Sequence, residues 1–204
     1  MSVPVQFIGD LAELPTHAYG HRSITWWGVV AFFLIEGTAF ALAIGAYFYL
    51  MGAEQTWPPA PYLPPNPVAG TIFTILLLSE IPNTLAKRAA EKKDLRALQK
   101  YLLIVCVLCA IMVIPRAFEF NSLNVSWKDN AYGSVIWMLL LLHVVHFGTD
   151  FVDSLVLAGL MFTKHAAEDR RFVDVSENAM YWRFVWLCWL PIYVLIYWLP
   201  RWVS

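Results

Sequence analysis

The chain has 204 residues, of which 59% are hydrophobic, 16% aromatic and only 14% charged. Because soluble domains carry about 25% charged residues, this composition favours a membrane protein. The formal net charge of −1 provides no basic excess, which argues against a nucleic-acid partner. The length fits a single domain covering 1–204.

The first predicted element is a membrane-crossing helix over 24–52. This run is almost entirely apolar and contains one carboxylate, Glu36, near its centre. As a helix it would be roughly 43 Å long, which exceeds the ~30 Å hydrocarbon thickness of a bilayer. Glu36 is therefore expected at mid-depth, where an ionisable group is costly and usually functional.

Four further apolar segments predict four more crossings. The expected helices cover about 68–87, 99–120, 132–163 and 179–200. Pro82 follows Glu80 closely in the second crossing and should bend or loosen that helix. A proline-rich loop joins the first two crossings, and it contains Trp57. The sequence thus predicts an all-α membrane protein with five transmembrane helices in one bundle.

The basic residues predict the orientation of these crossings. Ten of them fall on the side of the N-terminus, in the N-terminal tail, the loop after the second crossing and the loop after the fourth. Only Lys128 and Arg201 fall on the opposite side. Because cytoplasmic loops carry the excess of Lys and Arg, we expect a cytoplasmic N-terminus and a periplasmic C-terminus. The N-terminal tail should be polar and without a cleaved signal peptide.

The three cysteines lie inside the apolar runs and have no polar loop around them. We predict that Cys106, Cys109 and Cys188 are buried, unreactive thiols and not a redox or metal pair.

Several ionisable residues are expected near the middle of the membrane. Glu36 and Glu80 each lie twelve residues from a helix end, and the spacing of the fourth crossing predicts one shared polar face. That face should carry His143, His146, Asp150 and Asp153. Arg116 and Glu119 share a face nearer the outer side.

Three interpretations of these polar residues remain open. They could pair across helices and fix the packing, or the carboxylates could hold or relay protons. A third interpretation is a dinuclear metal site of the kind found in four-helix bundles. Its ligands would be Glu36, Glu80, Glu119, His143 and His146. Only His143 and His146 have tight ligand spacing, so we expect no metal in this chain.

Five motifs, in order along the chain, resemble subunit III of the haem–copper terminal oxidases. The first is the helix with a buried glutamate, here Glu36, and the second is the Trp-Pro-Pro loop that starts at Trp57. The others are the stretch 116–120, the His-x-x-His of residues 143–146, and the closing stretch 181–186 with 196–198. The resemblance runs from about residue 24 to residue 200.

The resemblance implies an accessory subunit of an oxidase that reduces O2 to water and translocates protons. Such a subunit binds no haem or copper itself and is held against subunit I, with subunit II and a further small subunit as other partners. It retains phospholipid between helices and sustains proton uptake. The five-helix length resembles short bacterial forms, which implies the bacterial inner membrane. The Trp-Pro-Pro loop favours a cytochrome c oxidase, while a quinol oxidase, a nitric oxide reductase accessory protein and a membrane metalloenzyme are the alternatives.

The last helix departs from the family pattern, because Arg183 and Trp186 stand where the family has His and Asp. Since the fourth crossing gains two acids, we expect Arg183 to pair with Asp153 or Asp150. We also expect three residues to bind lipid, namely Trp57, Arg116 and Arg183.

Two expectations concern neighbours and depth. Glu36 should be protonated or hydrogen-bonded, with His143 or His146 as its partner. The tryptophans at helix ends should form two interfacial belts. These belts are Trp26, Trp27 and Trp182 at the inner interface, and Trp57, Trp198 and Trp202 at the outer one.

Overall fold

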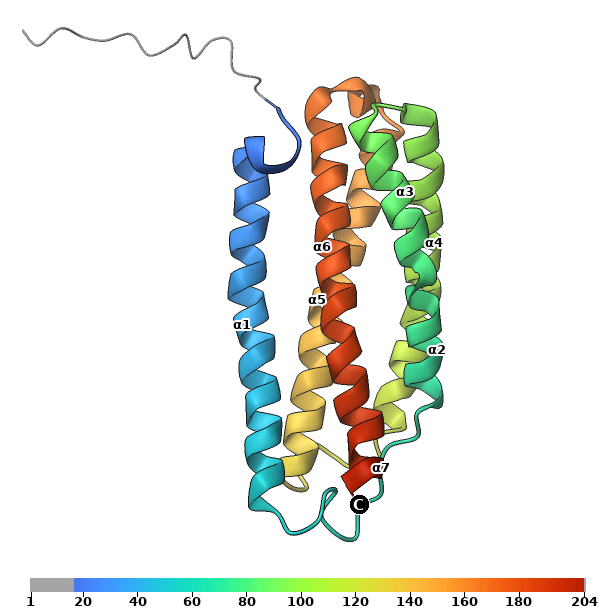
Figure 1. Ribbon diagram of the computed structural model, residues 1–204. Helices are drawn as coiled ribbons and strands as arrows, with labels where there is room; N and C mark the ends of the chain where they lie inside the picture. Colours follow the sequence, from blue (N-terminus) through green and yellow to red (C-terminus); the bar gives the residue numbers. More distant parts are fainter. Residues whose placement is uncertain (1–16, 204) are drawn as a thin grey trace, which may run out of the picture.

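The computed structural model of the chain describes residues 17–203, and five long helices run side by side along its length (Figure 1). The part of the N-terminal tail before residue 17 lies outside the described residues. Each of the five helical segments is long and apolar enough to cross a membrane. They are Ile24–Ala53, Val68–Glu91, Leu95–Asn121, Ala131–Met161 and Asp169–Val203. The predicted all-α class and the five crossings are confirmed.

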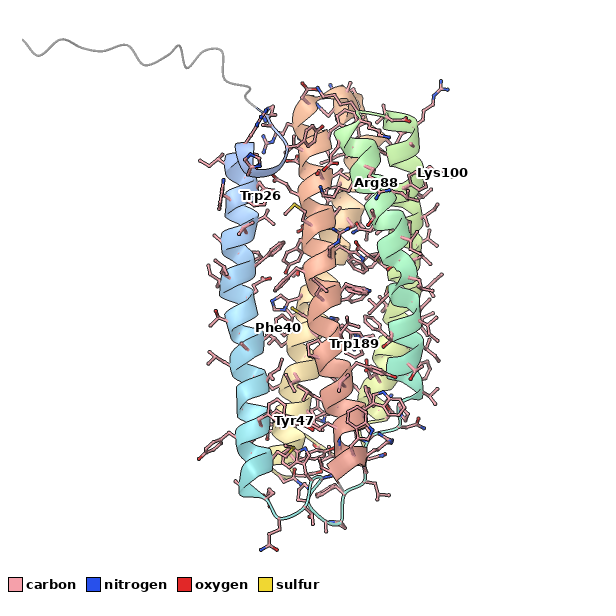
Figure 2. All side chains as sticks on the ribbon, in the orientation of Figure 1. Trp26, Phe40, Tyr47, Arg88, Lys100 and Trp189 are labelled. Atoms are coloured by element: carbon pink, nitrogen blue, oxygen red, sulfur yellow. The ribbon has the colours of Figure 1, made fainter. Side chains whose placement is uncertain are left out.

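The first segment is helix α1 (Ile24–Ala53), which lies at one edge of the bundle (Figure 1). Only 11% of its most apolar window is buried, against 44% for helix α5 (Ala131–Met161). Its inward side chains include Phe40 and Tyr47, which point from α1 into the bundle (Figure 2). Helix α1 therefore packs through one narrow stripe and exposes the rest of its apolar surface, as a membrane helix can.

The second crossing is divided, as Pro82 predicted. Helix α2 (Val68–Leu76) is followed by the 3-10 turn η3 (Leu77–Ser79) and then by α3 (Glu80–Glu91). Proline has no N–H to donate to the carbonyl four residues earlier, which is that of Leu78. The irregular turn falls there and places Glu80 at the start of α3.

The third and fourth crossings are continuous helices with side-chain caps at their N-termini. Helix α4 (Leu95–Asn121) begins after Asp94, whose carboxylate accepts from the Ala97 N–H at 3.1 Å. Helix α5 begins after Asn130, whose side-chain oxygen accepts from the Gly133 N–H at 2.7 Å. Both caps satisfy backbone donors that a helix start leaves free.

The fifth crossing begins earlier than the predicted residue 179. Helix α6 (Asp169–Tyr193) follows the short 3-10 helix η4 (Lys164–Ala167), and a π-helical turn η5 (Val194–Trp198) joins it to α7 (Leu199–Val203). The first turns of α6 bury Phe172, Val175 and Ala179, which recur at helical spacing. Charged residues lie between these three apolar residues, and for that reason the sequence analysis did not include this stretch in the predicted helix. As a result, Trp182 lies well inside the helix and not at its end.

The basic residues gather at one end of the bundle. Arg88 and Lys100 lie at the same end as Trp26, while Tyr47 lies towards the other end, where the C-terminus is found (Figures 1 and 2). This arrangement is the one that the predicted cytoplasmic N-terminus requires, and the orientation itself stays a prediction.

The tryptophan belts are only partly as predicted. Trp27, Trp198 and Trp202 are exposed, but Trp57 and Trp182 are 3% and 1% exposed. The indole N–H of Trp57 donates to the Tyr47 hydroxyl at 2.8 Å, so its polar group is satisfied inside the protein. The belt prediction is wrong for Trp57 and Trp182, and so is the expectation that Trp57 lies at lipid.

The cysteines lie in the bundle as predicted for inert thiols. Cys106 and Cys109 are buried, Cys188 is partly buried, and all three thiols are free.

Candidate functional site

Glu36 has a histidine partner, as predicted. The Oε1 atom of Glu36 on α1 lies 3.4 Å from Nε2 of His146 on α5, and both side chains are about one-tenth exposed. The ring of Phe40 lies 4.9 Å from the His146 ring and covers one side of it. The pair therefore joins α1 to α5 near the middle of both helices.

The hydrogen bond of His146 to the backbone defines which nitrogen faces Glu36. Its Nδ1 atom is 2.6 Å from the Leu142 carbonyl oxygen, which can only accept, so Nδ1 carries a hydrogen. A neutral imidazole would then turn the bare Nε2 towards Glu36, and a carboxylate opposite would bring two acceptors together. A proton on either Glu36 or His146 would supply the donor that this contact needs.

A groove of about 590 Å³ opens beside this pair, between α1, α5 and α6. Its walls are mainly apolar, and Glu36, His146, Thr149 and Tyr181 line its middle. The end of the groove near the start of α1 is charged. Its charged and polar residues are Asp153, Arg171, Asp174, Glu177 and Asn178. The groove thus combines a long apolar wall with a polar mouth.

The mouth of the groove is held by bonds between helices and within α6. Arg171 donates to Asp174 at 3.1 Å. Glu177 accepts from the hydroxyl of Thr25, at the start of α1, at 2.6 Å. This last bond closes the inner end of α1 against α6.

His143 faces a different environment from His146. Its Nδ1 accepts from Arg116 at 3.2 Å, and its Nε2 donates to the Val185 carbonyl at 3.1 Å. Because Arg116 can only donate, these two bonds define a neutral imidazole. His143 is fully buried and serves to hold α4, α5 and α6 together.

Arg116 and Glu119 form a buried ion pair on α4. Arg116 is 3% exposed and Glu119 is 0% exposed. The guanidinium carbon of Arg116 lies 3.6 Å from the ring centre of Phe73 and 4.1 Å from that of Trp189. Because its charge is enclosed by aromatic rings and a carboxylate, Arg116 cannot reach lipid, and the expectation that it would is wrong.

Tyr197, in the π-helical turn η5, also bonds to this ion pair. Its hydroxyl donates to Glu119 Oε1 at 2.6 Å. The sequence analysis did not identify this role, because the two residues are 78 positions apart and no spacing rule connects them.

Gly70 on α2 allows Tyr197 and Glu119 to approach the helix backbone. A Cβ atom at position 70 would lie 2.6 Å from Cε2 of Tyr197 and 3.1 Å from Oε1 of Glu119. We expect Gly70→Ala to destabilise the protein by about 1–3 kcal/mol, measured as a lower melting temperature of the detergent-solubilised protein. Gly45→Ala is the control, since nothing lies within 4 Å of its Cβ position. Equal melting of both variants would contradict the close approach.

Arg183 pairs with Glu80 and not with Asp150 or Asp153. Its Nε donates to Glu80 Oε1 at 2.7 Å, and its guanidinium also donates to Thr84 at 2.9 Å. The prediction is wrong because Arg183 lies on the side of α6 that packs against α3, away from the side that faces α5.

Arg183 lies at about the depth of Glu36. Its neighbour Phe184 stacks on Phe33, one helical turn before Glu36, with the ring centres 4.8 Å apart. Arg183 is therefore near mid-depth. Phospholipid headgroups do not lie at that depth, so its ion pair with Glu80 fits a structural role better than headgroup binding.

The predicted single polar face of α5 is divided between two environments. His143 and Asp150 are both 0% exposed and face the bundle interior. His146 and Asp153 line the groove. His143 and Asp150 are seven residues apart, as are His146 and Asp153, so the two residues of each pair lie on the same side of α5. The two pairs are shifted by three residues along the helix, so they face different neighbours.

The proposed metal ligands are likewise separated. Glu36 pairs with His146, Glu80 with Arg183, and Glu119 with Arg116 beside His143. Among residues 17–203, no three His, Cys, Asp or Glu side chains are grouped so that they could hold a metal ion. The donor set does not fit a dinuclear site.

Comparisons with known proteins agree with the motifs. The family model described as cytochrome c oxidase subunit III matches residues 12–202. The chain is 23% identical to cytochrome c oxidase subunit 3 of Thermostichus vulcanus, over 91% of this chain and 92% of the relative. It is 25% identical to the probable cytochrome c oxidase subunit 3 of Mycobacterium bovis, over 97% and 98% of the two chains. A match to the Myxine glutinosa subunit 3 is 30% identical and covers 70% of this chain but 55% of that longer protein.

Proposed function

This chain belongs to the cytochrome c oxidase subunit III family and is an accessory subunit of a haem–copper oxidase, and we propose that its membrane groove supports proton uptake by that oxidase. The observation that carries this proposal is the Glu36–His146 pair, in which a proton on either side chain would supply the donor that the contact needs. The protein is a multi-pass membrane protein of an oxidase complex. We place it in a bacterial inner membrane, because the chain covers 92% and 98% of the subunit 3 relatives from the bacteria Thermostichus vulcanus and Mycobacterium bovis.

The groove has the chemistry to hold a phospholipid. Its apolar walls suit acyl chains, and its mouth offers Arg171 to a phosphate beside the carboxylates Asp174 and Glu177. A cation and carboxylates side by side match a zwitterionic headgroup better than an anionic one. Arg171 is thus our candidate for the headgroup contact, because Trp57 and Arg116 are buried and the exposed Arg183 is paired with Glu80.

The expected partners are subunit I, which carries the haem and copper, together with subunit II. Helix α1 exposes an apolar surface along most of its length, including Leu34, Ile35 and Leu42. This surface is available both to lipid and to the helices of a larger subunit. Residues of this chain would bind no haem or copper, and they would act on the oxidase by holding subunits, lipid and a proton in place.

Purification of the tagged chain from its native membranes tests this function. We expect it to copurify with a large haem-bearing polypeptide, visible on a gel and in the absorption spectrum of the preparation. A tagged multi-pass protein of unrelated function from the same membranes serves as the control. Recovery of the chain alone, with stoichiometric metal of its own, would refute the proposal.

A further inference from the structure

Besides the hydroxyl of Tyr132, three buried polar side chains in the bundle interior have no hydrogen-bond partner among residues 17–203. They are the carboxyl group of Asp150, the indole N–H of Trp182 and the hydroxyl of Ser79. Their residues are 0%, 1% and 1% exposed. Buried polar groups are almost always hydrogen-bonded, and none of these three takes part in the Glu36 or Glu119 networks described above.

Asp150 and Trp182 lie in the same layer of the bundle. The rings of Phe147 and Trp182 are 5.9 Å apart, and the Ser154 hydroxyl accepts from Asn178 at 2.9 Å. Asp150 lies between Phe147 and Ser154 on the same face of α5. It therefore faces the stretch of α6 between Asn178 and Trp182.

Ser79 approaches this layer from the break between α2 and α3. One turn further along, Asn83 donates to the Ala179 carbonyl on α6 at 3.0 Å. Because the two helical segments run antiparallel, Ser79 falls opposite the residues one turn after Ala179, which include Trp182. Helix α4 closes the layer with Cys106, whose thiol donates to the Ser154 carbonyl at 3.5 Å.

No positive charge balances Asp150. Within residues 17–203 no basic side chain bonds to it. The titratable groups near it are the thiols of Cys106 and Cys109 on α4, the hydroxyl of Tyr181 on α6 and Asp153 on its own helix, and none of these carries a positive charge. An ionised carboxylate without a partner is strongly disfavoured inside a protein in a membrane. Asp150 is therefore the neutral acid, with one donor and free acceptor sites.

We propose that this layer is a binding site for buried water, organised around a protonated Asp150. Trp182 can only donate, and a neutral carboxyl group and a serine hydroxyl can each donate and accept. One water molecule accepts from Trp182 and Asp150 and donates to Ser79 and to the Asp150 carbonyl oxygen, which gives it four hydrogen bonds to three side chains. This number is at the top of the range for buried water.

The site adds a second proton-holding acid to the chain. Asp150 lies in the interior, whereas Glu36 lies at the groove, and the two are held by different neighbours. The inference depends on the three orphaned groups and not on the proposed function, so it stands or falls separately.

Infrared spectroscopy of the protein purified with its partner subunits tests the protonation of Asp150. The wild-type-minus-variant difference spectrum for Asp150→Asn should contain the carbonyl stretch of a neutral carboxyl group, shifted in D2O. Asp153→Asn, which removes the aspartate at the groove three residues away, should not remove that band. If the Asp150→Asn difference instead shows the paired stretches of a carboxylate, or if Asp153→Asn removes the same band, the proposal is wrong.

A high-resolution cryo-EM map of the same complex tests the water. We expect density for an ordered water within hydrogen-bonding distance of Trp182 Nε1 and of Asp150, and loss of that density in Trp182→Phe. Direct hydrogen bonds between these side chains, with no density between them, would overturn the proposal. The wild-type map remains decisive if a variant fails to assemble.

Discussion

Replacing Arg116 with methionine should reduce the free energy of unfolding by about 3–5 kcal/mol, because it leaves the Glu119 carboxylate buried without its cation. This loss is a large part of the ~5–15 kcal/mol that stabilises a typical protein. The amount of assembled protein in membranes and its melting temperature in detergent measure the effect. Arg88→Met is the matched control, since Arg88 is exposed at the end of the bundle and should tolerate the change.

The double variant Arg116→Met with Glu119→Leu separates charge from packing. If the stranded carboxylate causes the loss, removing it as well should restore most of the stability. If the double variant is as unstable as Arg116→Met alone, the loss comes instead from the other contacts of the pair, which are those of Arg116 with Phe73, Trp189 and His143 and the hydrogen bond of Tyr197 to Glu119.

The second large effect is expected at Glu36. Glu36→Ala should leave the bundle folded but loosen α1, because it removes the link between α1 and His146 on α5. We expect a loss of about 1–2 kcal/mol, together with weaker retention of the subunit and several-fold fewer turnovers before the oxidase inactivates. Subunit content and the number of turnovers to inactivation are the measurements.

Glu36→Gln distinguishes the structural from the proton-holding role. The glutamine amide can still donate to Nε2 of His146, so the subunit should stay bound, whereas the exchangeable proton of the pair is lost. We therefore expect normal subunit content with a shortened turnover lifetime. Wild-type behaviour of Glu36→Ala in both measurements would show that this carboxylate is incidental.

The membrane class and the five crossings could be predicted because long apolar runs have one stable solution in a bilayer. Pairing of Glu36 with a histidine of the fourth crossing was also predictable. Depth follows from residue counts, and a lone acid in an apolar helix needs a polar neighbour.

The predictions that were wrong concern the direction in which side chains face. Arg183 was assigned to the acids of the fourth crossing because helix counts give depth but not rotation about the axis. Its actual partner is Glu80, which lies at the start of α3, directly after the turn η3. Trp57 illustrates a second limit, since a tryptophan in a loop near the membrane surface can also fold under the bundle and bond to Tyr47.

The place of α1 at the edge of the bundle has a consequence for biosynthesis. Helix α1 packs against α5 and α6, which are the last two crossings to leave the ribosome. Between Glu36 and His146 the ribosome must add 110 residues, which takes about 5–20 s at ordinary rates of about 5–20 residues per second. During that delay the newly inserted helix has no histidine for its acid. The link between α1 and α5 can therefore form only after the fourth crossing has been made, and we expect α1 to depend on its apolar surface alone until then.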